Sequence, residues 1–107
     1  MPDYVLELEA DTDMLEIGRY TARRWGLDQM DVYLGGLESH FSAIAKRKVR
    51  EETVFEHRED FRVSRCDHHY VYFVREEGTV IILAVFHENM NRIERLRERL
   101  GWMGRSL

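Results

Sequence analysis

Two neighbouring stretches of the chain decide its fold: Arg62-Val-Ser-Arg-Cys-Asp-His-His-Tyr-Val-Tyr-Phe-Val74 and Thr79-Val-Ile-Ile-Leu-Ala-Val-Phe-His-Glu-Asn-Met90. Their β-branched and aromatic residues predict strands over residues 62–66, 69–75 and 79–87. Asp67-His68 marks the first turn, and Glu77-Gly78 is a tight hairpin signal. Residues 79–87 are almost continuously apolar, so we expect this strand to be central and covered on both faces of the sheet.

Upstream of these strands, the sequence predicts a short strand over residues 4–8 and then two amphipathic helices. We expect Asp11 or Asp13 to cap the first helix, Gly26 to end it, and Asp28 to cap the second. The connection between the helices is about two residues long, which favours an antiparallel hairpin. The apolar stripes are Met14, Ile17, Thr21 and Trp25 in the first helix, and Tyr33, Leu34, Leu37, Phe41, Ile44 and Ala45 in the second. Gly35 and Gly36 inside the second helix indicate close packing on a neighbouring element.

The remaining segments complete one domain over residues 1–107. Residues 49–60 are charged and weakly periodic, which predicts a loop with one helical turn. Asn89 is expected to cap a last helix, which Gly101 ends, and residues 102–107 then form a mobile tail. Met90, Ile93, Leu96 and Leu100 form the apolar stripe of this helix. The expected order is β-αα-βββ-α, an α+β fold with a twisted antiparallel sheet, an α-helical hairpin packed against it and a C-terminal helix.

The charge of −4 at pH 7 is unevenly distributed. Residues 1–45 carry three basic and nine acidic side chains, whereas residues 92–107 carry five basic and two acidic ones. This balance argues against nucleic acid as the main partner, because phosphate contacts need a clear basic excess. The single cysteine and the lack of a membrane span or basic leader favour a cytoplasmic protein. No pattern predicts a cofactor.

Several motifs, taken in their order along the chain, resemble the ParE toxins of the ParE/RelE superfamily. The first helix carries Glu16-Ile17, Tyr20-Thr21 and Trp25-Gly26, and the sheet carries His69-Tyr-Val-Tyr-Phe73. Arg65-Cys-Asp-His-His-Tyr-Val and Val85-Phe-His-Glu-Asn-Met90 are similar to the plasmid-type subgroup. The likeness extends over nearly the whole chain, and the order of the motifs is more specific than any one of them.

The resemblance implies a toxin of a type II toxin–antitoxin system that inhibits DNA gyrase, blocks replication and has no catalytic chemistry of its own. It also implies neutralisation by a ParD-like antitoxin, a ribbon-helix-helix protein whose C-terminal segment wraps over the toxin. We expect the antitoxin to contact the helical hairpin, with Trp25, Tyr33, Leu37 and Phe41 as candidates that are also core candidates. Gyrase-binding candidates are Arg65, His87, Met90, Arg92, Arg95 and Arg99.

The main alternative is a RelE-like nuclease that cuts messenger RNA on the ribosome. Such chemistry needs cations at the phosphate and a proton-transferring group. In the RelE-like pattern an arginine follows the tyrosine of the third strand, whereas here Val71 follows Tyr70. Arg65 and the three histidines His68, His69 and His87 would still be available for it. A third hypothesis is an inactive module that binds only its antitoxin.

A metal site built from Cys66 and these histidines is disfavoured, because adjacent His68 and His69 would point to opposite faces of a strand. We expect Cys66 to pack as a small apolar residue.

Overall fold

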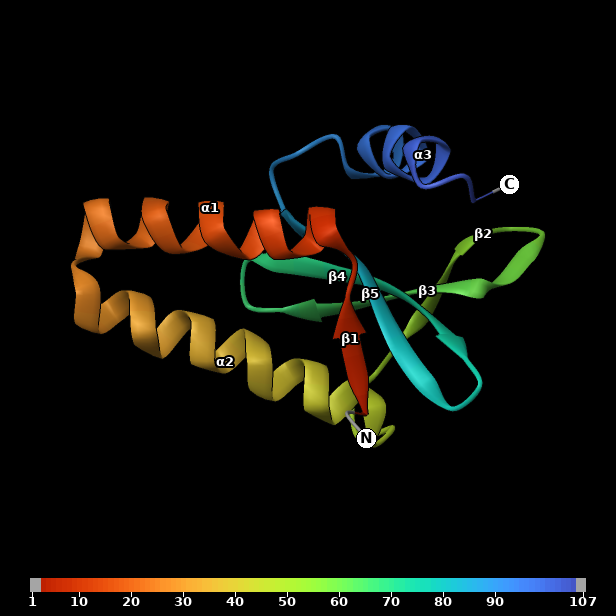
Figure 1. Ribbon diagram of the computed structural model, residues 1–107, viewed down its shortest axis with the longest axis horizontal. Helices are drawn as coiled ribbons and strands as arrows, with labels where there is room; N and C mark the ends of the chain where they lie inside the picture. The colour runs from red at the N-terminus through yellow and green to blue at the C-terminus, as the bar shows by residue number, and fades with distance from the viewer. Residues whose placement is uncertain (1–2, 106–107) are drawn as a thin grey trace.

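The computed structural model describes residues 3–105 and contains three helices and five strands (Figure 1). The elements in chain order are β1 Tyr4–Leu6, α1 Leu8–Trp25, α2 Leu27–Ala45, β2 Glu52–Phe55, β3 Arg58–Cys66, β4 His69–Glu76, β5 Thr79–His87 and α3 Arg92–Trp102. The helical hairpin, the sheet and the C-terminal helix confirm the α+β fold that the sequence predicts.

The five strands form one sheet in the order β1-β5-β4-β3-β2. The neighbours β2, β3, β4 and β5 are antiparallel, but β1 pairs with β5 in parallel, so the sheet is mixed rather than wholly antiparallel. The parallel pair follows from the connection, because strands that run in the same direction need a long crossover between them. Here the α1–α2 hairpin and the β2–β4 strands lie between β1 and β5 in the sequence.

Strand β2 corrects the expectation of a loop over residues 49–60. It is a short edge strand paired with β3, and the register shifts between Thr53 and Phe55. Its first two residues are exposed and its last two are half-buried, so it lacks the apolar–polar alternation that marks a strand in a sequence. Pairing with β3, rather than local propensity, makes this segment extended.

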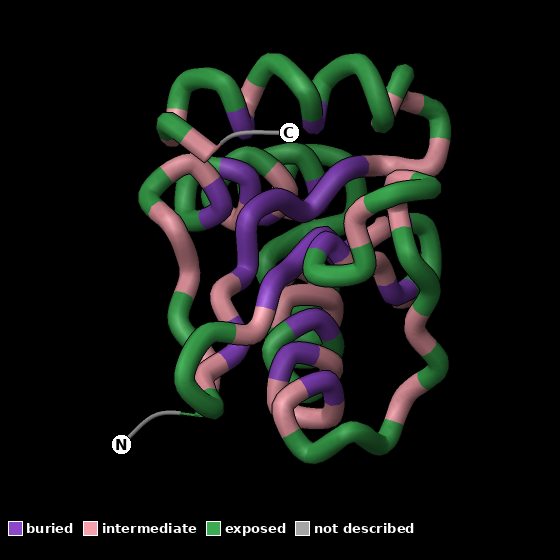
Figure 2. Tube along the Cα trace, turned by 90° about the vertical axis from the view of Figure 1, so that its right-hand side faces the viewer, coloured by how far each residue is buried: buried purple, intermediate pink, exposed green. Residues whose placement is uncertain are grey.

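The sheet separates two hydrophobic cores (Figure 2). Val71 and Phe73 of β4 face α1 and α2, whereas Tyr72 and Val74 face α3. Successive side chains of β4 thus point to opposite faces of the sheet. Strand β5 contributes to both cores, which confirms that it is a central strand with both faces covered. The hairpin core also contains Ala10, Leu37, Phe41, Ile44, Val80, Ile82 and Val85, and the α3 core contains Phe61, Leu83, Ala84, Phe86, Leu96 and Leu100.

A single residue, Gly26, joins α1 to α2, and its φ of 95° lies in the region that favours glycine. Its N–H donates to Ala22 O and so ends α1 as predicted. The predicted caps are wrong, because Asp11 and Asp13 lie inside α1 and Asp28 lies inside α2.

The expected close packing at Gly35 and Gly36 is also wrong, because a Cβ on either would meet nothing within 4 Å. The tight helix contact is at Gly18, where a Cβ would lie 3.1 Å from Leu34 Cδ1. The glycine at which the two helices pack closely is therefore Gly18 in α1, and not Gly35 or Gly36 in α2.

Helix α3 starts later and ends later than predicted. Its N-cap is Asn91 rather than Asn89, and Gly101 lies inside the helix, which ends at Trp102. Beyond it, Arg105 forms ion pairs with Glu76 (2.7 Å) and Glu7 (3.4 Å). Residues 102–105 of the expected tail are thus attached to the fold, and residues 106 and 107 lie outside the described part of the chain. Between residues 3 and 105, no helix combines the length and apolar character that crossing a membrane requires.

Candidate functional site

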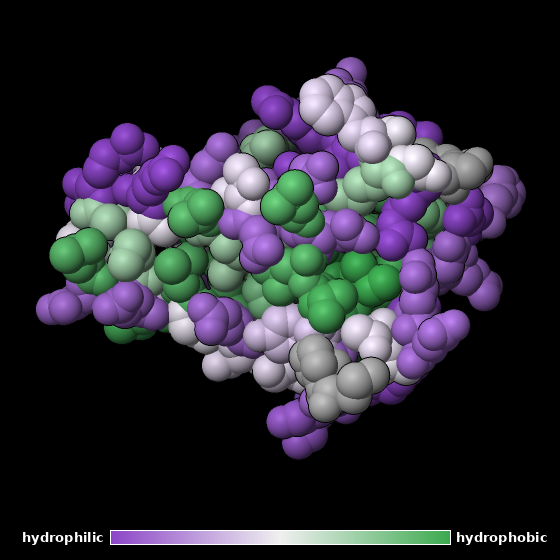
Figure 3. Space-filling view, in the orientation of Figure 1, coloured by the Kyte–Doolittle hydropathy of each residue, from purple (hydrophilic) through white to green (hydrophobic). Residues whose placement is uncertain are grey.

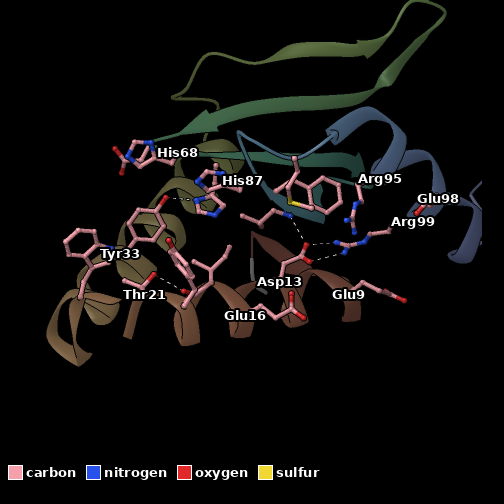
Figure 4. Close-up of a pocket in the computed structure, with 18 of the residues that line it drawn as sticks. Glu9, Asp13, Glu16, Thr21, Tyr33, His68, His87, Arg95, Glu98 and Arg99 are labelled. Carbon is pink, nitrogen blue, oxygen red and sulfur yellow. Dashed lines mark hydrogen bonds and ion pairs between the residues drawn. The ribbon is translucent and has the colours of Figure 1, made fainter. Parts of the chain in front are cut away.

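A groove of about 1190 Å³ runs along α1. Figure 4 shows its side chains converging from α1, from α3, and from the ends of β4 and β5. One wall is the face of α1 that carries Glu9, Asp13, Glu16, Tyr20 and Trp25, and the opposite wall includes Met90, Arg95, Glu98, Arg99 and Trp102. The histidines His68, His69 and His87 lie with Tyr33 near the C-terminal half of α1.

Asp13 and Arg99 connect the two walls of the groove. Arg99 donates from both terminal nitrogens to the Asp13 carboxylate, and the Nη2–Oδ1 distance is 2.9 Å. Asp13 Oδ2 also accepts a hydrogen bond from Val85 N–H at 2.9 Å. Both side chains are largely buried, with 10% of Asp13 and 18% of Arg99 exposed. The pair therefore fixes α1, β5 and α3 relative to one another.

The backbone of β5 explains why Asp13 is needed there. Strand β1 pairs with β5 only as far as Ile82, so residues beyond it have no strand neighbour on that side. A register shift between Tyr72 and Phe73 leaves Leu83 as an extra residue in β5. Beyond this bulge, Val85 N–H faces Asp13, and Leu83 O lies 3.4 Å from Arg99 Nη1. The ion pair thus takes the place of a neighbouring strand.

The histidine end of the groove contains a short hydrogen bond between Tyr33 and His69. The Tyr33 hydroxyl lies 2.5 Å from Nδ1 of His69. Burial lowers the pKa of His69 to about 4, and the neighbouring His87 and His68 add to this effect. Burial also raises the pKa of Tyr33. Tyr33 and His69 therefore share one hydrogen bond while both rings are neutral.

Arg65 shares Glu88 with His68 and is neutralised by this carboxylate. Arg65 lies 2.6 Å from Glu88, and its Nε donates to the carbonyl of Asp67. Glu88 also lies 2.8 Å from Nδ1 of His68, and these contacts lower the pKa of Glu88. Arg65, a candidate cation for the nuclease alternative, is thus held by an acidic neighbour.

The six candidate gyrase-binding residues are divided by the structure. His87, Met90, Arg95 and Arg99 line the groove, whereas Arg65 and Arg92 do not. Arg92 stacks on Tyr70, 3.8 Å from the ring centroid, and donates to the Tyr72 hydroxyl. Of the groove arginines, Arg99 is engaged with Asp13 and Arg95 is exposed.

The four candidate antitoxin-binding residues also divide. Leu37 and Phe41 are 1% and 0% exposed, so they belong to the hairpin core. Trp25 is 65% exposed, and both Trp25 and the half-buried Tyr33 line the groove. Only the latter two present surface to a partner.

Two further side chains that could carry chemistry have structural roles. In a smaller hollow, His40 Nε2 lies 2.9 Å from Ser64 Oγ, which itself donates to the Arg50 carbonyl. The serine proton is therefore not directed at the histidine, as a nucleophile would require. Cys66 packs against the hairpin core, and burial raises the pKa of its thiol. Among residues 3–105, no three His, Cys, Asp or Glu side chains are grouped as metal ligands.

The hairpin also exposes apolar surface outside the groove. Figure 3 shows apolar side chains forming a band along the face seen in Figure 1. Leu8 and Leu15 are exposed and lie seven residues apart on α1, so they share one side of the helix. Neither residue lines the groove.

Sequence reasoning missed several groove residues, among them Asp13, Tyr20 and Trp102. Asp13 was interpreted as a cap, although it lies three residues from Ala10 and four from Ile17 on the inward face of α1. That position was the available signal, because a buried carboxylate needs a partner. Trp102 was assigned to a tail, and no periodic signal placed it in the helix.

Comparison with known proteins gives consistent matches. Residues 4–92 match the family model described as "ParE toxin of type II toxin-antitoxin system, parDE". The chain is 35% identical over 101 residues to "Toxin ParE" of Escherichia coli, covering 94% of this chain and 98% of that protein. It is 32% identical over 89 residues to "Toxin ParE1" of Mycobacterium tuberculosis strain H37Rv, covering 82% of this chain and 91% of that protein.

Proposed function

Because this chain belongs to the family of ParE toxins of type II toxin–antitoxin systems, we propose that it inhibits DNA gyrase and is neutralised by a ParD-like antitoxin. In this proposal the toxin works in the cytoplasm, blocks replication by binding gyrase, and catalyses no reaction of its own. The antitoxin is a ribbon-helix-helix protein whose C-terminal segment covers the toxin.

The observation that carries the proposal is the groove with two exposed tryptophans on its walls. Trp102 is 87% exposed and Trp25 is 65% exposed, and both line the groove. Large aromatic side chains dominate the binding energy of protein interfaces, whereas a folded monomer gains little from exposing them. The groove therefore suits the binding of another polypeptide, and we assign it to the antitoxin.

The surface around the groove's mouth is our candidate for gyrase. Arg95 and Met90 lie on the α3 side of the groove, and the arginines of residues 92–107 give this end of the chain a basic excess. Gyrase engaged with DNA has a negative field, so exposed arginines would steer the encounter. An antitoxin in the groove would then compete directly with gyrase.

The RelE-like ribonuclease remains the second candidate, because Tyr33, His68, His69 and His87 meet at one end of the groove. Imidazoles can move protons between a 2′-hydroxyl and a leaving group. The charge at this end favours the first proposal, however. Cleavage of RNA needs a cation that stabilises the negative charge on the phosphate in the transition state. The adjacent Arg65 is already neutralised by Glu88.

The decisive experiment compares the two targets. We expect purified toxin to inhibit gyrase supercoiling or to accumulate cleaved DNA, and a His68→Gln variant to keep the effect on gyrase. Transcript cleavage in a translating extract, with gyrase unaffected and cleavage lost in His68→Gln, would establish the nuclease instead. If neither activity is present while an antitoxin still binds, the chain is an inactive binding module.

A further inference from the structure

The end of α2 carries a dense run of positive charge. Four of the five residues 46–50 are basic and exposed, namely Lys46, Arg47, Lys48 and Arg50. Across residues 3–105, the first three form no ion pair, and Arg50 has only a loose one with Glu52, at 3.9 Å. We call residues 46–50 the basic end of α2. Its charge is available to a partner.

The backbone of the basic end has a defined shape. Arg47 N–H donates to the carbonyl of Ile44, and Lys48 N–H donates to that of Ala43. These two bonds form a Schellman motif, which needs a residue in the left-handed region just after the helix. Here that residue is Arg47, with a φ of 56°. The cations therefore project from a hydrogen-bonded turn rather than from an irregular loop.

Arg47 occupies a position that suits glycine better. A residue with a Cβ is strained in the left-handed region, and glycine would make the same two main-chain bonds without that strain. The helix dipole favours a cation near the end of α2, but Lys46 already supplies one. Stability therefore does not explain an arginine at this position, and its charge points to a binding role.

The nearby carboxylates do not neutralise the basic end. Glu51 is bound by Arg62 at 3.0 Å and by Arg75 at 2.8 Å. Arg75 also donates to the Ile44 carbonyl in the last turn of α2. Residues 46–52, together with the two arginines bound to Glu51, supply six cations against two carboxylates, in a chain whose net charge is −4. The excess of positive charge here is therefore local.

The basic end also lies away from the groove, and none of its residues lines the groove. In the view of Figure 1, α2 ends at the lower side of the molecule, whereas α3 lies at the top. The other basic segment, residues 92–107, uses much of its charge internally, because Arg99 pairs with Asp13 and Arg105 pairs with Glu7 and Glu76. A polypeptide in the groove would leave the basic end of α2 open.

Closely spaced cations on a defined turn suit a partner with closely spaced negative charges. Double-stranded DNA carries one negative charge per about 1.7 Å of its axis. Resting on the function proposed above, we infer that the basic end of α2 contacts the phosphate backbone of the DNA that gyrase holds. The contact is auxiliary and reads no base sequence, and the net charge of −4 keeps the toxin alone from binding DNA tightly.

The contact is tested by NMR, with isotope-labelled toxin and a DNA duplex of about 12 base pairs. We expect the shifts of the amide signals to be largest at residues 46–50. Four phosphate contacts give a slope of about −3.6 when the logarithm of the affinity is plotted against that of the salt concentration. The double variant Arg47→Gly/Lys48→Gln should reduce this slope to about −1.8 and weaken binding about tenfold at low salt.

The matched control is Arg19→Gln/Arg23→Gln, which removes two exposed cations of α1 that lie outside the groove. It should change the affinity for the duplex by less than about twofold, because these residues lie outside the proposed contact. The unfolding temperature of Arg47→Gly should equal or exceed that of the wild type, since glycine relieves the strain at this position. A lower unfolding temperature would mean that the arginine serves the fold, which counts against the inference.

Three NMR results would overturn the inference: no shifts with the duplex, shifts centred on α3, or equal shifts with a deca-glutamate peptide. The last result would indicate an acidic protein as the partner. In the supercoiling assay, Arg47→Gly/Lys48→Gln should inhibit gyrase more weakly than the wild type, and equal inhibition would refute the contact with gyrase-held DNA. If the wild type binds DNA through residues 46–50 but leaves gyrase active, the proposed function fails and the DNA contact stands.

Discussion

Asp13 combines an ion pair and a main-chain hydrogen bond in one carboxylate. Replacing Asp13 with alanine leaves the Arg99 charge and the Val85 N–H without their partner in a largely buried place. We expect Asp13→Ala to lower the free energy of unfolding by about 3 kcal/mol, measured by urea denaturation. The double variant Asp13→Ala/Arg99→Ala should cost less than the sum of the single variants, because both remove one interaction.

The matched control is the exposed pair of Arg58 and Asp60, whose closest atoms are 2.8 Å apart. Asp60→Ala should change the stability by no more than about 1 kcal/mol, since solvent screens exposed pairs. Equal costs at Asp13 and Asp60 would show that burial adds nothing to the groove pair.

His69 makes the stability of the protein depend on pH. Its pKa in the fold is about 4, below the value of about 6.5 in an unfolded chain. Between these values the unfolded state binds the extra proton, so stability is full above pH 6.5 and falls as the pH drops toward 4. The loss amounts to about 3 kcal/mol from this group.

The measurement is the free energy of unfolding across that range. The curve of His69→Gln should fall less steeply than that of the wild type between pH 6.5 and 4, because glutamine does not titrate. His57→Gln, in the exposed β2–β3 turn, should leave the wild-type slope unchanged. Parallel curves for His69→Gln and the wild type would contradict the role given to His69.

Substitutions at the glycines of the helical hairpin should change the stability of the protein. Gly35 and Gly36 lie inside α2 with open space at their Cβ positions. Gly35→Ala and Gly36→Ala should therefore each stabilise the protein by about 0.5–1 kcal/mol, through helix propensity alone. Thermal unfolding measures this gain.

Gly26→Ala is the contrasting variant, because φ at this position is 95° and strains any residue with a Cβ. We expect it to destabilise the protein, although its Cβ would meet no neighbour within 4 Å. A loss of stability in Gly35→Ala would instead show that a Cβ at this position is not accommodated in open space.

The elements with strong periodicity were predictable, and those shaped by distant partners were not. Strand β5, both turns of the β3–β5 meander and the stripe of α2 follow from local pattern. Strand β2 does not, because its edge position leaves Glu52 and Thr53 exposed and only pairing with β3 makes it a strand. The helix starts were misplaced because acidic residues near a helix start resemble caps, whatever partner they find later.

The site was predictable only in part for the same reason. The histidine cluster involves strand ends that lie close together in the sequence, and the β4–β5 register pairs His87 with His69. Asp13 and Arg99 are 86 residues apart, and no local pattern links them. Leu37 and Phe41 share the helical spacing of interface residues, and only packing shows that they are core.

The groove as a whole makes a prediction about partner binding. Trp25→Ala and Trp102→Ala remove large exposed rings, so we expect each to weaken antitoxin binding at least about tenfold while leaving the unfolding temperature unchanged. Calorimetric titration of the toxin with the antitoxin measures the affinity.

Val32→Ala is the matched control, since Val32 is 67% exposed on α2 but outside the groove. Phe41→Ala should instead cost about 3–5 kcal/mol of stability, because the ring is fully buried. If Val32→Ala weakens the complex and the tryptophan variants do not, the antitoxin binds a different face.

During translation, Asp13 is made long before Arg99, its partner in the ion pair. While a ribosome is still making the last fourteen residues before 106, Asp13 has no arginine and the second face of the sheet has no helix over it. A message that is cut or stalled there yields a product with bare apolar strands, which is prone to self-association. The fold is therefore complete only once α3 has been made, and copies that stop short of α3 lack both the ion pair and the cover over this face of the sheet.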